Sequence, residues 1–594
     1  GGSQKIPMDR GDYGYHSVMA GNVAPGTRYK YQVNEDQSFP DPASLSQPDG
    51  VHEASEVIDL EDFEWEDQDW DNVPLKDMIQ YELHTGTFTP GGNFEGVKSK
   101  IGYFRELGVN AIEIMPVAQF SGHRNWGYDG VYPFAVQHSY GGAKALMDLV
   151  NECHRNGIAV ILDVVYNHFG PEGNYVGNFG HYFSGKYSTP WGQSINFDGP
   201  HSDGVRNFFI QNALMWCRDF HIDALRLDAV HAIFDFSARH IMWELADKLE
   251  ELNVQTGRKH YLIAESHLND VRYINPVSKG GYSLDAQWSD DFHHAVHTLV
   301  TEEKKGYYMD YGLPEHLSKS MKDAFVYDGK YSEFRKKTYG STTEKNSGDQ
   351  FVIFSQNHDQ VGNRLWGERL VSLAGFETAR LVAGALFLAP NVPMLFMGQE
   401  YGERNPFYYF VSHLDPELNR LVREGRKNEF KDFYEDSEEA MAPDLTGTFE
   451  KSRLSWNIGD EPEKKSMFDY YKRWIDLRKH HPVLQIPDKE NFRISHEGKV
   501  LLMERWQNQN HLFAVLNFET DNAKVLVPSS LPYSLKRLID SSDTLWAGPG
   551  TSCPDLVEAG DEIIIAPQTV VAFSNETGMF APKTNANGNN GRTS

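Results

Sequence analysis

The chain has 594 residues, too many for one compact core, so we expect roughly two to four domains. Its net charge of −28 argues against a nucleic-acid partner and against anionic membranes, because both favour basic surfaces, so a neutral substrate fits better. No apolar run approaches the ~18 residues of a membrane-spanning helix, and the N-terminal residues lack a signal-peptide core; we expect a cytoplasmic protein.

The first part of the chain, residues 1–52, reads as short β segments broken by Gly, Pro and Asp. An acidic linker follows at 53–77 and carries Phe63, Trp65 and Trp70. These aromatic side chains could form a glycan platform. We favour the alternative, a solvated linker that its aromatic side chains pin to the protein.

Short apolar runs and amphipathic helices alternate from residue 78 to residue 486, which is typical of a parallel α/β sheet and predicts a (β/α)8 TIM barrel. A helix over 145–156 ends at Gly157, and a helix over 467–480 closes the outer layer. The predicted strands are Met78–Leu83, Ala111–Met115, Ile158–Asp163, Ala224–Asp228, Tyr261–Glu265, Leu284–Trp288, Phe351–Gln356 and Val392–Met397.

Two departures from a minimal barrel are visible. The third unit is about twice the usual length, and its excess lies in a loop insertion at about 170–202, where a barrel builds its active site. After residue 486 the chain becomes β-rich, which predicts a C-terminal antiparallel β domain over 487–576. We expect the polar segment 577–594 to be a disordered tail.

Carboxylates follow three of the predicted strands. Asp228 and Glu265 end neighbouring strands, and Asp359 follows the seventh. Retaining glycosidases need two such carboxylates, a nucleophile and an acid/base, about 5 Å apart. Arg226 points to the same side of its strand as Asp228 and would favour its ionised form. Glu265 must instead begin protonated, so we expect a raised pKa.

Four segments carry a family resemblance: Asp163-Val-Val-Tyr-Asn-His168, Leu225-Arg-Leu-Asp-Ala-Val-His231, Ala264-Glu-Ser266 and Gln356-Asn-His-Asp359. In this order they resemble the four motifs of the α-amylase superfamily, glycoside hydrolase family 13. The resemblance implies that Asp228 is the nucleophile, Glu265 the acid/base and Asp359 the transition-state stabiliser. It also implies that residues 1–52 form an N-terminal β-sandwich, which is incomplete relative to the family pattern. It implies no cofactor and no catalytic metal.

Further positions take roles from the same resemblance. Asp163 and Asn167 would support the site. The residues expected to bind substrate are Tyr128, His168, Arg226, His231, His358 and Asp291. The segment Asp290–His294 could also be read as a metal cluster, but we favour a cleft or packing role for it. The three cysteines are widely spaced without a zinc pattern, so we expect reduced structural thiols.

Finer matches point to one group within the family. The segments 167–175, 189–192, 195–199 and 284–294 resemble members that hydrolyse the α-1,4 bond next to a terminal trehalose unit. The expected partner is therefore a neutral α-glucan, maltooligosyltrehalose. One alternative is glycogen branching or another α-glucan transfer, in which a sugar hydroxyl replaces water. Another is a non-catalytic glycan-binding protein, although all three carboxylates are present. The oligomeric state stays open.

Overall fold

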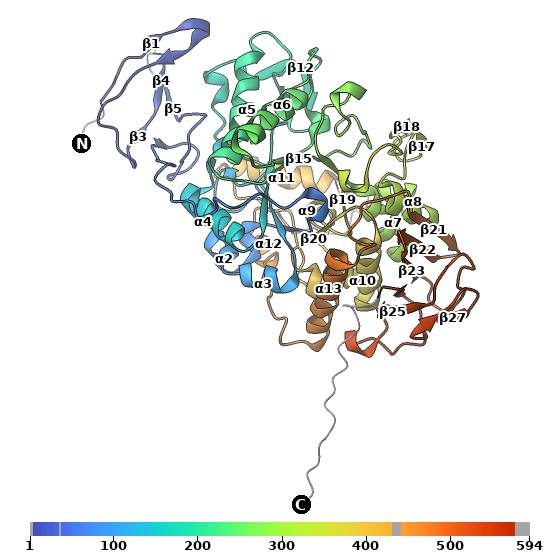
Figure 1. The fold of residues 1–594 in the computed structure, drawn as a ribbon. Coiled ribbons are helices and arrows are strands. Elements are labelled where there is room, and N and C mark those ends of the chain that lie inside the picture. Colours follow the sequence, from blue (N-terminus) through green and yellow to red (C-terminus); the bar gives the residue numbers. More distant parts are fainter. Residues whose placement is uncertain (1–3, 35–36, 430–440, 577–594) are drawn as a thin grey trace, which may run out of the picture.

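The computed structural model describes residues 4–34, 37–429 and 441–576. A barrel occupies the centre of the molecule (Figure 1). Short N-terminal strands lie at one end, and a sheet built from the C-terminal part of the chain lies at the other. The predicted disordered tail, 577–594, lies outside the described residues.

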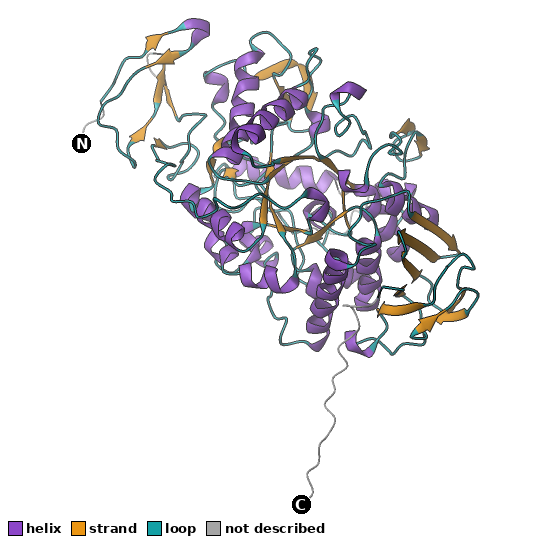
Figure 2. Ribbon diagram, viewed as in Figure 1, coloured by secondary structure: helices purple, strands orange, loops and turns teal. Residues whose placement is uncertain are grey.

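The central sheet is a closed barrel of eight parallel strands, and Figure 2 shows them as a ring surrounded by helices. This confirms the TIM-barrel prediction. Around the barrel the order is β11, β14, β15, β16, β19, β20, β7, β8. Their bounds are β7 Gln80–Leu83, β8 Ala111–Ile114, β11 Ala159–Val164, β14 Ala224–Leu227, β15 Tyr261–Ala264, β16 Ala286–Ser289, β19 Phe351–Phe354 and β20 Val392–Phe396.

The side chains that fill the barrel change from apolar to polar along its axis. Inward positions near the strand starts are small or apolar, such as Ala159 and Ala224, and belong to one buried cluster. Because side chains alternate with a period of two, the inward residues further along are Asp163 on β11 and Arg226 on β14. The apolar layer thus supports a polar layer at the carboxyl ends of the strands, where TIM barrels place their active sites.

Helices cover the outside of the barrel. Gly108 ends α3 with a φ of 99°, a conformation that suits glycine at a helix C-terminus. The helix bounds are α1 Thr85–Phe88, α2 Phe94–Lys98, α3 Ile101–Leu107, α4 Gly142–Arg155, α5 Ser202–Arg218, α6 Ile241–Thr256, α7 Asp290–Thr301, α8 Pro314–Asp323, α9 His358–Gly362, α10 Leu370–Leu388, α11 Pro416–Glu429, α12 Thr446–Lys451 and α13 Pro462–His480.

Contrary to the expectation from the sequence, helix α10 is long and apolar enough to cross a membrane, and it is the one such helix among the described residues. Its most apolar window has a mean hydropathy of 1.4, but 72% of that window is buried inside the protein. The helix packs against α13 and against strand β28, Thr569–Ser574, of the C-terminal sheet. Its composition is therefore explained by a core position between two layers.

Three short antiparallel pairs make up what the described residues show of the predicted N-terminal sandwich. The pair of β3 with β6, Ser55–Glu56, takes the N-terminal unit past the boundary predicted at residue 52. The strands are β1 Asp9–Arg10 with β2 His16–Ser17, β3 Arg28–Tyr29 with β6, and β4 Tyr31–Val33 with β5 Gln37–Phe39.

The acidic segment 53–77 is partly exposed, and its aromatic side chains attach it to one end of the barrel. Trp70 stacks on His154 with ring centroids 4.7 Å apart, and its Nε1–H donates to Asp223 Oδ1 at 2.7 Å. Trp65 stacks on His221 at 3.7 Å. Since Asp223 directly precedes β14, these contacts lie at the amino ends of the strands. The aromatic side chains pin the segment as expected, but far from the carboxylates, which leaves no support for a glycan platform at the site.

The C-terminal part forms the predicted antiparallel β domain, with a six-stranded sheet in the order β21, β22, β23, β28, β25, β26. A buried Arg505 fastens it to the barrel layer by donating from Nη1 to the carbonyl of Leu388 at 2.8 Å. The strands are β21 Phe492–Glu497, β22 Val500–Gln507, β23 Asn510–Asn517, β24 Ala523–Leu526, β25 Leu535–Asp540, β26 Leu556–Val557, β27 Glu562–Ile565 and β28.

Candidate active site

A cleft of about 1350 Å³ opens at the carboxyl ends of the barrel strands. Asp228, Glu265 and Asp359 all contribute to its wall. This volume exceeds the range of pockets that hold a single small ligand, so the cleft has room for several sugar units. Its aromatic lining residues are Trp126, Tyr128, Trp191, Tyr307, Tyr308, Trp366 and Tyr409.

Asp228 and Glu265 come from adjacent strands. Asp228 follows β14 and Glu265 follows β15, and the two strands pair in parallel with Leu227 opposite Ala264. The backbone N–H of Ala229 donates to Glu265 Oε2 at 2.7 Å, which fixes that carboxylate against the neighbouring loop. The strand pairing therefore brings the two predicted catalytic carboxylates to one place.

Arg226 is fully buried between the carboxylates. Its Nη1 donates to Asp228 Oδ1 at 2.8 Å and to Asp163 Oδ2 at 2.8 Å, while Nη2 lies 3.8 Å from Glu265 Oε2. The guanidinium carbon also lies 4.3 Å from the ring centroid of Trp288. A buried cation so placed favours the ionised form of the nearest carboxylate.

Burial dominates the electrostatics of the pair. Burial raises the pKa of Asp228, Arg226 lowers it, and the charge of Glu265 raises it again. Burial also raises the pKa of Glu265, with Arg226 opposing and the charge of Asp359 adding to the rise. A raised pKa agrees with the expectation for Glu265, since a general acid must hold its proton near neutral pH. For Asp228, the guanidinium limits a rise that burial would otherwise make larger.

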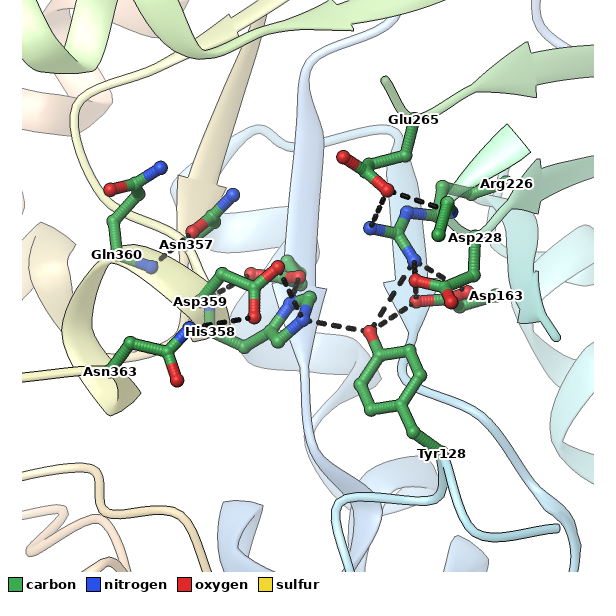
Figure 3. Close-up of polar contacts among 12 residues, drawn as sticks. Tyr128, Asp163, Arg226, Asp228, Glu265, Asn357, His358, Asp359, Gln360 and Asn363 are labelled. Carbon is green, nitrogen blue, oxygen red and sulfur yellow. Dashed lines mark hydrogen bonds and ion pairs between the residues drawn. The ribbon is translucent and has the colours of Figure 1, made fainter. Parts of the chain in front are cut away.

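Tyr128 connects the two sides of the site (Figure 3). Its hydroxyl donates to Asp163 Oδ2 at 2.6 Å and lies 2.8 Å from His358 Nε2. The rings of Tyr128 and His358 stack with centroids 5.2 Å apart. His358 Nε2 also lies 3.4 Å from Asp359 Oδ2, so the third carboxylate joins the same network.

The insertion at 170–202 reaches the cleft as a hairpin of β12 Phe183–Thr189 and β13 Gly192–Ile195. Between these strands, Pro190 and Trp191 line the cleft. Trp191 is 47% exposed and stacks on His168 with centroids 5.0 Å apart and an interplanar angle of 9°. A flat exposed ring beside the carboxylates offers an apolar face to a sugar.

Comparison with known proteins agrees with this geometry. The family model for the alpha-amylase catalytic domain matches residues 38–188. Malto-oligosyltrehalose trehalohydrolase of Saccharolobus solfataricus is 51% identical, over 80% of this chain and 81% of that protein. The enzyme of the same name from Arthrobacter ramosus is 41% identical, over 81% and 84%.

The chain belongs to the malto-oligosyltrehalose trehalohydrolase family.

Solved structures place this trehalohydrolase-family chain among alpha-amylase folds. A Salmonella typhimurium protein described as an alpha amylase superposes with a TM-score of 0.86 at 34% identity, covering 96% of this chain and 93% of that one. A 1,4-alpha-glucan branching enzyme of Pseudoalteromonas atlantica is a more distant relative, at 26% identity over 67% of this chain and 57% of its own length.

Within this trehalohydrolase-family site, the residues predicted to support the strand ends differ in how they are held. Asp163 accepts from Arg226 and from Tyr128, so it is anchored on two sides. Asn167 is buried, but its side-chain amide has no hydrogen-bond partner. His231 lines the cleft, and burial lowers its pKa to about 4, which leaves the ring neutral.

Asp291 was expected to bind substrate, but it does not reach the cleft. Its carboxylate is 1% exposed and accepts from Asn269 Nδ2 at 2.8 Å, from the Tyr311 hydroxyl at 2.7 Å and from the Val326 backbone N–H at 2.6 Å. These bonds use its acceptor sites, so it holds the loops around α7 together. Asp290 and Asp291 are the first two residues of α7 and have different partners: Asp290 accepts from Gln360, whereas Asp291 accepts from the three groups above.

Two carboxylates near the site, Asp290 and Glu82, received no individual catalytic or substrate-binding role from the sequence. Asp290 accepts from Gln360 Nε2 at 3.2 Å, and burial together with the charges of Glu265 and Asp359 raises its pKa to about 8. Glu82 on β7 pairs with His358 at 2.5 Å. The sequence signal for Glu82 was the alternation in Gln80-Tyr-Glu82, because side chains two residues apart lie on the same face of a strand, here the inside of the barrel.

Among residues 4–34, 37–429 and 441–576, no group of three His, Cys, Asp or Glu side chains is arranged to hold a metal ion. Within the segment once read as a possible cluster, His293 uses Nδ1 to bond the Ser355 carbonyl at 2.6 Å. The three cysteines, all in the described part of the chain, are buried free thiols.

Proposed function

We propose that this chain is a retaining glycoside hydrolase that cleaves the α-1,4 bond next to the trehalose end of maltooligosyltrehalose. Trehalose and a malto-oligosaccharide are the products. One observation carries the proposal: in a chain 51% identical to a protein named malto-oligosyltrehalose trehalohydrolase, two carboxylates on adjacent strand ends contact one buried guanidinium. This arrangement supplies the paired carboxyl groups that a double displacement needs.

In the first step, Asp228 is the nucleophile. Its carboxylate oxygen attacks the anomeric carbon of the sugar on the non-reducing side of the scissile bond. As that bond breaks, Glu265 gives its proton to the departing O4 of trehalose. Asp359 lies beside the imidazole of His358 and stabilises positive charge that develops on the sugar ring. A covalent glycosyl-enzyme and free trehalose result.

In the second step, Glu265 acts as a base. It removes a proton from water, the water oxygen bonds to the anomeric carbon, and the bond to Asp228 breaks. The malto-oligosaccharide leaves with a new reducing end, and both carboxyl groups return to their starting protonation states. Two inversions at the same carbon give net retention, so the new end is the α-anomer.

The cleft fits a neutral α-glucan chain, with aromatic faces such as Trp191 and Trp366 along its wall. The hairpin in the insertion at 170–202 contributes Pro190 and Trp191 to this wall. We also propose the cytoplasm as the location, where reducing conditions keep thiols such as Cys153 and Cys217 unpaired.

The test uses two incubations in parallel, one with maltooligosyltrehalose and one with a plain malto-oligosaccharide of equal length. We expect free trehalose in the first and far slower cleavage in the second. Equal rates on both would overturn the proposal. A branching enzyme is the second candidate only through the distant relative at 26% identity, and it would instead produce α-1,6 branches from the plain glucan.

A further inference from the structure

Glu82 is a fully buried carboxylate on β7 that the proposed mechanism does not use. Its Oε1 lies 2.5 Å from His358 Nδ1, and its Oε2 accepts from the backbone N–H of His358 at 2.9 Å. Both side chains are 1% exposed. The carboxylate therefore contacts the histidine twice, once at the ring and once at the backbone N–H at the start of α9.

The hydrogen bonds around His358 decide how many protons the ring carries. The Tyr128 hydroxyl donates its single proton to Asp163, which also accepts a hydrogen bond from Nη1 of Arg226. Tyr128 can then only accept from His358 Nε2, 2.8 Å away, so Nε2 must carry a proton. An ionised Glu82 can only accept, so Nδ1 must carry one as well.

We infer that Glu82 is a positioning residue that holds His358 as an imidazolium, oriented between Tyr128 and Asp359. The inference rests on the proposed function, because it assigns Glu82 a part in that reaction. The site then contains two fixed cations, Arg226 beside Asp228 and His358 beside Asp359. Arg226 favours the ionised form of Asp228, the nucleophile, whereas burial raises the pKa of Glu265, the proton donor.

The electrostatic surroundings of His358 agree with this assignment. Burial on its own would lower the pKa of His358, but the charges of Asp359 and Glu82 and the hydrogen bond to Glu82 raise the pKa to about 9. Arg226 acts in the opposite direction. The titratable groups that face the ring from the surrounding elements are Glu82, His84, Glu113, Tyr128, Asp163, Arg226, Glu265 and Asp359.

Glu113 provides a matched control on the adjacent strand. It sits directly opposite Glu82 in the pairing of β7 with β8 and is equally buried. Neither of its carboxylate oxygens has a hydrogen-bond partner, and burial raises its pKa well above the ordinary value. Burial therefore disfavours its ionised form, and replacing it by glutamine leaves the two hydrogen bonds between Glu82 and His358 in place.

The experiment compares pH–rate profiles of Glu82→Gln and Glu113→Gln on maltooligosyltrehalose. We expect Glu82→Gln to lower the pKa of the basic limb of the kcat/KM profile by about one pH unit or more. At pH values above the wild-type limb, kcat/KM should therefore fall about 10-fold relative to wild type. Glu113→Gln should keep the wild-type profile. In a His358→Gln background, Glu82→Gln should cause no further loss, because it acts through that ring. A Glu82→Gln profile that overlays the Glu113→Gln profile would overturn the inference.

A spectroscopic measurement on the wild-type protein covers the case in which Glu82→Gln does not fold. With 15N-labelled histidine, the His358 signals can be assigned by their absence in His358→Gln. Both ring nitrogens should be protonated at pH 7.5, and a neutral ring there would refute the assignment. This readout is independent of which glucan is cut, so it separates failure of the Glu82 role from failure of the proposed function.

Discussion

Asp228 and Glu265 share one counterion but share it unequally. Nη1 of Arg226 lies 2.8 Å from Asp228 Oδ1, whereas Nη2 lies 3.8 Å from Glu265 Oε2. The interaction between charges falls with distance, so the guanidinium stabilises the ionised form of Asp228 more strongly. The unequal contact gives two similar carboxyl groups different tasks. Asp228 is favoured as the anion, and Glu265 is favoured as the proton donor.

The nucleophile assignment predicts that Asp228→Asn folds and loses turnover by several powers of ten. The substitution keeps the shape of the side chain but removes the charge that attacks the anomeric carbon. Initial rates on maltooligosyltrehalose provide the measurement, and circular dichroism with thermal melting provides the control for folding. A folded Asp228→Asn that retains more than about a hundredth of the wild-type rate is incompatible with this role.

The acid/base assignment predicts a dependence on the leaving group. Glu265→Gln cannot protonate O4 of trehalose, so it should fail on the natural substrate. An activated aryl glycoside leaves without a proton, so the covalent intermediate should still form. A burst of released phenol followed by slow turnover would show this. Equal losses of the burst and of natural turnover would mean that Glu265 has another role.

The His358 ion pair predicts a pH-dependent contribution to stability. Its folded-state pKa, about 9, lies above the ordinary value near 6.5 of an unfolded histidine. The contribution is thus fully present below about pH 6.5 and is lost as the pH rises through 9. The urea midpoint difference between wild type and His358→Gln should shrink over that interval. A difference that grows with pH would reverse the sign and contradict the pairing.

The chemistry proposed for Asp228, Glu265 and Asp359 routes no step through a metal. Exhaustive chelation, followed by assay in chelator-treated buffer, should therefore leave kcat and KM on maltooligosyltrehalose unchanged. A loss of rate that one added divalent cation restores, and others do not, would show that an ion takes part.

Much of the fold could be predicted because the barrel strands are short apolar runs with clear ends. Ala224–Leu227 and Tyr261–Ala264 are each followed by a carboxylate, and both strands lie where they were expected. The sixth strand was the least distinct in the sequence. The structure places β16 over Ala286–Ser289, so that its end brings Asp290 toward the site.

Other features depend on contacts between distant segments, and a single sequence does not reveal them. Asp67, in the acidic segment, is buried because His154, His221 and Arg258 surround it, although its neighbours in the chain are polar. Likewise, Glu82 matters through His358, which lies 276 positions along the chain. Asp291 is the opposite case. The motif led us to expect a substrate-binding residue, but the side chain of Asp291 makes structural hydrogen bonds instead.

The most direct test of the account is proton NMR of maltooligosyltrehalose hydrolysis during its first minutes. Double displacement through Asp228 predicts that the new reducing end appears as the α-anomer, while trehalose signals grow in equal amount. The β-anomer would appear only later, by mutarotation. A β-anomeric signal that grows first, or a new reducing end without matching trehalose, would contradict the retaining mechanism and the bond assigned to it.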